Sequence, residues 1–123
     1  MRNLPEGAIP PVIQDHIGAY RRHDIEALMA TLAPDALVND IQREFIGHSA
    51  IRAWADEEIV RPKVTLEIEA AFEHFGATII RFRVDGEFDK SNLPDPLILT
   101  YYFTVSGDRI SQLIILHNKA VAL

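Results

Sequence analysis

The chain has 123 residues, of which 48% are hydrophobic and 24% charged, and this is the size and composition of one globular domain. Its net charge of −6, with Arg21 and Arg22 as the one adjacent basic pair, excludes nucleic acid as a partner, because phosphate binding requires clustered cations. The sequence contains no cysteine, no apolar run of about 18 residues that could span a membrane, and no secretory signal at its start. We therefore expect one cytoplasmic domain over residues 1–123, with no membrane partner.

Helical patterns come first along the chain. Residues 1–9 are predicted to be a loose lead-in, and the following Pro10-Pro11 suits a helix start, where a missing N–H costs little. Apolar residues then recur at three- and four-residue spacing as far as Arg22, which predicts a helix. Asp24 is a typical N-cap, with no other role expected, and predicts a second short helix that ends at Pro34-Asp35.

A short strand and a third helix follow. Residues 36–41 (ALVNDI) predict the strand, which leads into a turn through Gly47. The third helix is expected over residues 49–60, with Trp54 on its inward face. His48 precedes this helix, and we expect it either to help start the helix or to lie at the rim of a site.

Past Pro62 the hydrophobic period changes from that of a helix to that of a strand. Residues 64–69 and 80–84 alternate apolar with polar side chains, and a turn near Gly76 joins the two strands. This register predicts two cross-strand ion pairs on the outer face of the sheet, Glu67 with Arg83 and Glu69 with Arg81.

The last two strands are apolar at nearly every position. They are predicted over residues 97–105 and 110–118, joined by a hairpin turn at 106–109, after a polar loop over residues 85–96. Helices can cover only one face of such a hairpin, so the other face needs a different cover. We expect that cover to be a second copy of the chain, which makes the protein a homodimer.

The order of these elements, and two stretches of the sequence, resemble a known group of proteins. The stretches are HDIEALMATLAPDALVNDIQREFIGHSAIRAW and YYFTVSGDRISQLIIL, and the resemblance covers nearly the whole chain. It is to the SnoaL-like polyketide cyclase and ketosteroid isomerase branch of the nuclear-transport-factor-2-like superfamily. The resemblance implies an α+β fold, a cone-shaped roll of N-terminal helices packed in a curved, mostly antiparallel sheet. Such a cone encloses a pocket that could hold a small hydrophobic ligand.

Asp40 is the most informative residue under this resemblance. It ends the ALVND strand and matches the position of the catalytic base of the isomerase. A carboxylate that faces an apolar cavity loses solvation, which strengthens it as a base for removing a proton next to a carbonyl. The alternative is a solvated aspartate that caps the turn through Gln42 and Arg43.

The resemblance also implies a hydrogen-bond donor for the developing enolate. His16 falls where the isomerase has its oxyanion-binding tyrosine, and an imidazole can donate such a bond. The alternative is a histidine at the edge of the core, with its ring bonded to a backbone carbonyl or water. Tyr20 lies one helical turn further on and could donate instead.

One part of the isomerase site is missing. The isomerase has a protonated aspartate on its fifth strand as a second donor, but the matching position here falls at or next to Leu99. Tyr101 or Tyr102 could replace it. The expected ligand-binding residues are Trp54, Phe82, Leu99 and Tyr101, and the alternative for Trp54 is a position in the core. His117 could face either the pocket or a partner.

No pattern in the sequence indicates a metal or a cofactor. The five histidines lack the spacing of a zinc site, and the acidic residues Asp85, Glu87 and Asp89 fit a solvated loop better than a calcium loop. Two hypotheses follow. The first is a cofactor-independent isomerase or cyclase that acts on a small hydrophobic carbonyl compound, with Asp40 as general base. The second is a non-catalytic module of the same fold that binds a ligand or forms an accessory dimer.

Overall fold

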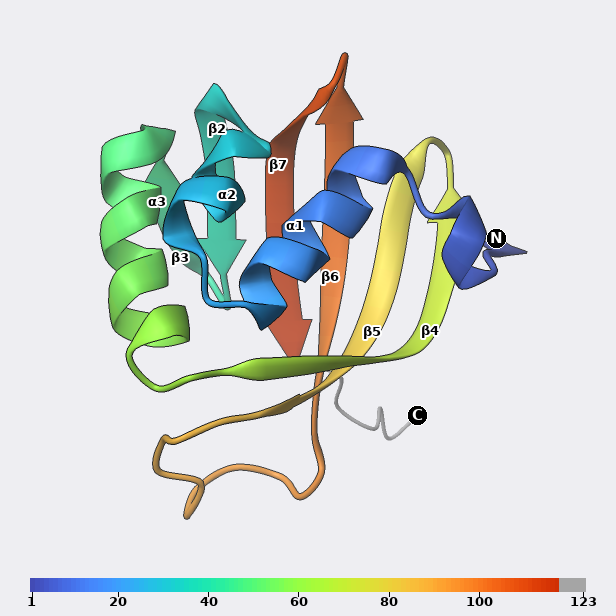
Figure 1. Cartoon of the computed structure of the whole chain (residues 1–123). Coiled ribbons are helices and arrows are strands. Elements are labelled where there is room, and N and C mark those ends of the chain that lie inside the picture. The colour runs from blue at the N-terminus through green and yellow to red at the C-terminus, as the bar shows by residue number, and fades with distance from the viewer. Residues whose placement is uncertain (118–123) are drawn as a thin grey trace.

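A computed structural model describes residues 1–117 and contains one curved sheet with helices packed against one of its faces (Figure 1). The seven strands lie in the order β1-β4-β5-β6-β7-β2-β3. Only the β2–β7 pair is parallel among the strand pairs described, so the predicted α+β roll with a mostly antiparallel sheet is confirmed. In chain order the elements are β1 (Arg2–Asn3), η1 (Glu6–Ala8), α1 (Pro11–Arg21), α2 (Ile25–Ala30), β2 (Leu32–Asp40), β3 (Arg43–Ile46), α3 (Gly47–Ala55), η2 (Asp56–Val60), β4 (Thr65–His74), β5 (Ala77–Asp85), β6 (Leu97–Ser106) and β7 (Arg109–His117).

The first two helices form where the sequence predicts them. The Asp24 carboxylate accepts a hydrogen bond from Ala27 N at 3.1 Å, which confirms it as the N-cap of α2. The helix ends earlier than predicted, at Ala30, because Leu32 already pairs with Ile110 of β7. The lead-in at 1–9 is not loose either, since β1 pairs with β4 and η1 follows it.

The region between β2 and α3 contains a strand where the sequence predicts only a turn. β3 pairs antiparallel with the end of β2, so that Asp40 lies opposite Arg43. The third helix starts at Gly47, buries Trp54, and widens after Ala55 into the π-helical segment η2. This hairpin and η2 together border the site described below.

The register of β4 and β5 agrees with the prediction on one side of a bulge and departs from it on the other. Glu67 lies opposite Arg83, as predicted. A bulge between Ile68 and Ala70 then places Ala70, not Glu69, opposite Arg81, so the predicted Glu69–Arg81 pair is wrong. Glu69 instead forms its ion pair with Arg83, with Oε1 and Nε 3.5 Å apart.

The hairpin of β6 and β7 has two apolar faces. The inward face carries Leu99, Tyr101 and Phe103, all buried against the helices. The outward face carries apolar side chains as well, among them Leu116, which is 41% exposed. The final residue of the predicted strand, Asn118, lies outside the described residues.

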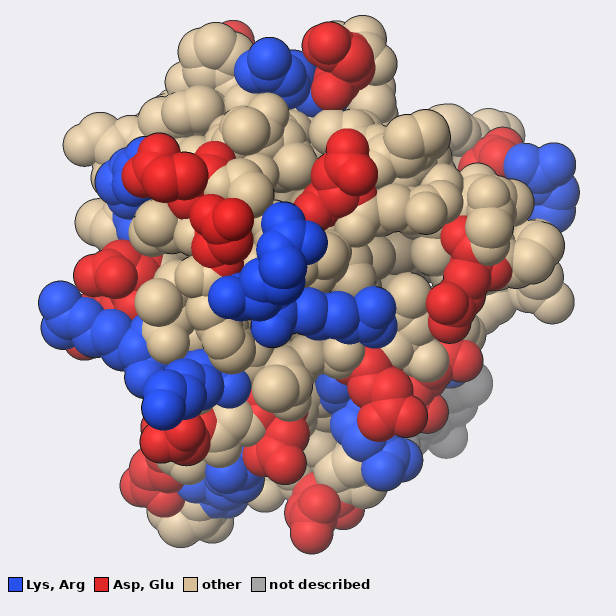
Figure 2. Space-filling view, in the orientation of Figure 1, with Lys and Arg blue, Asp and Glu red and all other residues tan. Residues whose placement is uncertain are grey.

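Charge is distributed evenly over the helix-covered side. Acidic and basic side chains intermingle there without gathering into one patch of either sign among the residues described (Figure 2). Within residues 1–117 none of the helices combines the length and the apolar character that a membrane crossing requires.

Candidate functional site

A pocket of about 430 Å³ opens beside the end of β2. Its wall is built by residues of the helices α1, α3 and η2, of the strands β2, β3, β5, β6 and β7, and of the loop between β5 and β6. Most of the wall is apolar, and it includes Ile59, Val64, Val84, Leu97, Leu99 and Ile115. Asp40, Tyr20 and Tyr101 also line it, as do the charged or titratable side chains of Arg43, Glu57, Glu58 and His117. A larger groove of about 820 Å³, between α1 and the β6–β7 turn, includes none of these polar residues.

The alternation of β2 directs Asp40 into this pocket. Side chains two residues apart share a face of a strand, and Val38 on the same face is completely buried. Only 13% of the Asp40 side chain is exposed. The neighbouring Asn39 points the other way, and its Oδ1 accepts the hydrogen bond from Gln42 N at 2.9 Å. Asn39, rather than Asp40, therefore caps the turn.

Two donors hold the Asp40 carboxylate by the same oxygen. Trp54 Nε1 donates to Oδ2 at 3.0 Å, and Arg43 Nη2 donates to Oδ2 at 2.5 Å. Within residues 1–117, Oδ1 accepts no hydrogen bond from protein. The carboxylate is thus fixed in orientation, with one oxygen left to meet a ligand.

Arg43 reaches Asp40 because of an unusual turn. Ile41 and Gln42 have φ values of 51° and 70°, so both central residues of the two-residue hairpin are left-handed. This conformation is costly for a β-branched residue such as Ile41, and strain of this kind clusters at functional sites. The guanidinium also forms two hydrogen bonds to Glu58, at 2.7 and 2.8 Å. Glu58, and then Asp40, raise the pKa of Arg43, which keeps it charged.

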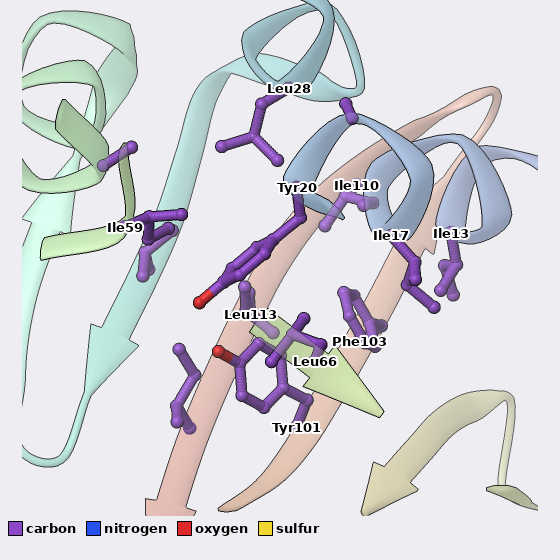
Figure 3. Close-up of a cluster of buried hydrophobic side chains, with 14 of the residues drawn as sticks. Ile13, Ile17, Tyr20, Leu28, Ile59, Leu66, Tyr101, Phe103, Ile110 and Leu113 are labelled. Atoms are coloured by element: carbon purple, nitrogen blue, oxygen red, sulfur yellow. The ribbon is translucent and has the colours of Figure 1, made fainter. Parts of the chain in front are cut away.

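Tyr20 of α1 and Tyr101 of β6 meet inside the pocket. Each side chain is 3% exposed, and their hydroxyl groups point toward each other (Figure 3). Burial raises the pKa of both phenols, and the charge of Asp40 adds to the effect in each. The interaction between the two hydroxyl groups lowers the pKa of Tyr20 and raises that of Tyr101.

The other predicted site residues divide between the pocket and the core. Leu99 and Trp54 line the pocket, as does His117. Phe82 does not line it; its ring is completely buried and packs edge-on against Tyr101, with centroids 4.9 Å apart.

The structure does not bring His16 to this pocket. His16 Nδ1 lies 2.8 Å from Thr31 Oγ1, and the imidazole packs edge-on against Phe103. Burial lowers the pKa of His16 from 6.5 to about 4, so the ring is neutral at physiological pH. His48, the other histidine singled out for the rim, lies 3.0 Å from Leu32 O through Nε2.

The sequence reasoning missed several wall residues. Arg43 was predicted only as a residue of the turn after Asp40, and Glu58 was given no role. Arg43 nevertheless follows Asp40 by three residues, the spacing that places two residues opposite each other across a two-residue turn. Phe88 and Leu93 of the β5–β6 loop gave no signal, because loops have no hydrophobic period. Among the described residues no group of three His, Asp or Glu side chains is arranged to hold a metal ion.

Comparisons with known proteins agree with this architecture. The family model for the SnoaL-like domain matches residues 13–113. A solved structure of a candidate polyketide cyclase from Sinorhizobium meliloti is 28% identical, covers 92% of this chain and 100% of its own, and superposes with a TM-score of 0.81. Among curated proteins none matches.

Two further solved structures share the fold at lower identity. A candidate ketosteroid isomerase from Kribbella flavida is 10% identical, with coverage of 91% of this chain and 78% of its own and a TM-score of 0.72. A protein with a ketosteroid isomerase-like fold from Catenulispora acidiphila, in complex with trimethylamine, is 17% identical, with coverage of 87% and 85% and a TM-score of 0.73.

Proposed function

Because the chain belongs to the SnoaL-like domain family, we propose that it is a cofactor-independent enzyme of isomerase or polyketide-cyclase type. Its substrate is a small hydrophobic carbonyl compound, and Asp40 is the general base. The observation that carries the proposal is the convergence of Asp40 with the Tyr20 and Tyr101 hydroxyls in a mostly apolar pocket. The names of the neighbours, a candidate cyclase and a candidate isomerase, support the same reaction class.

The chemistry follows from the two oxygen atoms of Asp40. Trp54 and Arg43 occupy Oδ2, so Oδ1 removes a proton from the carbon next to the carbonyl. The C–H electron pair moves into the C–C bond, the carbonyl π pair moves onto oxygen, and an enolate forms. The Tyr20 hydroxyl donates a hydrogen bond to that oxygen, where charge develops.

Two outcomes then return Asp40 to its carboxylate form. In an isomerase, protonated Asp40 returns its proton to a different carbon of the same molecule. In a cyclase, the enolate carbon attacks a second carbonyl carbon of the substrate, and Asp40 gives its proton to the resulting alkoxide. Both routes require only groups that line the pocket. His16 has no part in them, since its ring bonds to Thr31.

A second candidate function is ligand binding without turnover. The observation that favours it is the Arg43–Asp40 ion pair, which offsets the charge of the proposed base at 2.5 Å. The strand position of a second acidic donor is also occupied by the apolar Leu99. In this case the same pocket would bind the same class of compound and leave it unchanged.

Proton exchange separates the two functions even while the natural substrate is unidentified. Cyclic and linear ketones are incubated with the protein in D₂O, and deuterium uptake next to the carbonyl is followed by NMR. If the protein is an enzyme, the wild type exchanges these protons. Tyr20→Phe removes the hydrogen bond to the enolate oxygen and slows the exchange by about 10²-fold, the usual effect of removing one oxyanion donor. Tyr102→Phe is the matched control and keeps the wild-type rate, because Tyr102 is the neighbour of Tyr101 on β6 and does not line the pocket. Binding with no exchange by the wild type supports the second function.

A further inference from the structure

A second hollow lies next to the pocket, and four side chains separate the two. The second hollow, of about 460 Å³, lies under the loop between β5 and β6. Both hollows are lined by Val84, Phe88, Leu93 and Leu97. These four side chains are therefore the partition between the two spaces.

The partition lies at the end of the pocket away from Asp40. Asp40 pairs with Ile115 of β7, and Ile115 pairs with Tyr101 of β6, so these three residues form one row across the sheet. Leu97 is four residues before Tyr101 on β6, which places it about 13 Å along the strand at roughly 3.3 Å per residue. A ligand whose carbonyl meets Asp40 and which lies along β6 extends toward the partition.

The two halves of the partition differ in how they are held. Val84 and Leu97 pair with each other on β5 and β6, so they form a fixed floor. Phe88 and Leu93 belong to the loop, which extends beyond the end of the sheet (Figure 1). Only these two side chains can be changed or displaced without changing the sheet.

The loop is seated on the segment that follows η2. A Cβ at Gly86 would lie 3.0 Å from Pro62 O, Val64 Cα and Phe88 Cε1, so only glycine permits this close approach. Lys90 Nζ lies 4.8 Å from the centroid of the Phe88 ring, and Lys90 lines the second hollow but not the pocket.

We propose that Phe88 and Leu93 determine which ligands the pocket accepts by closing its far end. The inference deepens the proposed function: it assigns as substrate class an uncharged apolar carbonyl compound that is short enough to stop at Phe88. The cations of the second hollow are already paired, Lys90 with Asp85 at 3.2 Å and Arg83 with Glu69 at 3.5 Å, so they offer no site for an anionic tail.

Binding of methyl ketones of increasing chain length tests this proposal. Trp54 lines the pocket and is the one tryptophan of the chain, so its fluorescence reports ligand there, and calorimetry gives the affinity. In the wild type each methylene raises affinity by about fourfold until the chain meets Phe88, after which affinity stops rising. In Phe88→Ala the two hollows join, and the plateau moves to longer ketones. The first ketone beyond the wild-type limit then binds at least about fourfold more tightly to the variant.

Two further proteins complete the design. Phe75→Ala removes a phenyl group that is 96% exposed on another turn, and it keeps the wild-type plateau. Leu93→Ala replaces Phe88→Ala if the latter does not fold. The proposal is overturned if the variants that fold bind ketones with the wild-type plateau, or if no ketone binds to the wild type. If the affinity plateau shifts in Phe88→Ala but the protein exchanges no protons, the length limit is supported and the proposed catalysis is contradicted. Failure of the length limit and failure of the proposed function therefore give different results.

Discussion

The buried His16 gives the protein a pH-dependent stability that can be calculated. Thr31 Oγ1 donates to Leu28 O at 2.7 Å and therefore accepts from the His16 Nδ1–H. Burial lowers the pKa of His16 from 6.5 to about 4 in the folded state. Between these two pH values the unfolded chain binds a proton that the folded chain does not, so stability falls as the pH falls.

The size of the loss follows from the two pKa values. Full titration between 6.5 and about 4 corresponds to about 3 kcal/mol, at roughly 1.36 kcal/mol for each pKa unit. At pH 5 the titration of His16 has already lowered the free energy of unfolding by about 2 kcal/mol, which is most of the full loss. This is a large part of the stability of a domain of this size.

Urea unfolding at pH 7 and pH 5 measures this contribution. The wild type should lose about 2 kcal/mol more than His16→Gln, which keeps a side-chain N–H but does not titrate. His74→Gln, at the exposed end of β4, is the matched control and should lose as much as the wild type. An equal loss in the wild type and in His16→Gln would show that the reasoning about His16 is wrong.

Two other predictions concern the helix cap and the outer sheet face. Asp24→Ala removes the cap of α2 and should lower the free energy of unfolding by about 1 kcal/mol in urea titrations; an unchanged midpoint would contradict the cap's contribution. We propose that the outer face of β6 and β7 forms a homodimer, because it is apolar and helices cover only the other face. Sedimentation at micromolar concentration should then show a dimer that Leu116→Lys dissociates, whereas a wild-type monomer of 13.9 kDa would contradict it.

Elements with a clear period or a strong cap could be predicted from the sequence. The α1 periodicity, the Asp24 cap and the β6–β7 turn follow from local rules, and the structure agrees with each. β3 could not be predicted in this way, because a four-residue strand with two charged residues has too little pattern. The bulge near Glu69 could not be predicted either, because apolar and polar side chains alternate on both sides of the inserted residue.

The site could be predicted only in part from the sequence, because local patterns do not show how side chains pack in the fold. The position of Asp40 at the end of the ALVND strand and the family resemblance predicted it as a site residue, and it lines the pocket. His16 and Tyr20 lie one turn apart on the same apolar helix face, so only packing separates them: one ring meets Phe103 and the other meets Tyr101. The partnership of Arg43 with Asp40 depends on a left-handed turn that no residue in it favours.

The α-proton exchange rate of Asp40→Asn tests the central claim most directly. The variant keeps a side chain of the same shape that can accept from Trp54 Nε1, so ketone binding measured by Trp54 fluorescence should stay within about threefold of the wild type, which is less than 1 kcal/mol. Loss of the general base should slow exchange by at least about 10²-fold. Wild-type exchange in Asp40→Asn, with ketone binding retained, would contradict the assignment of Asp40 as the base.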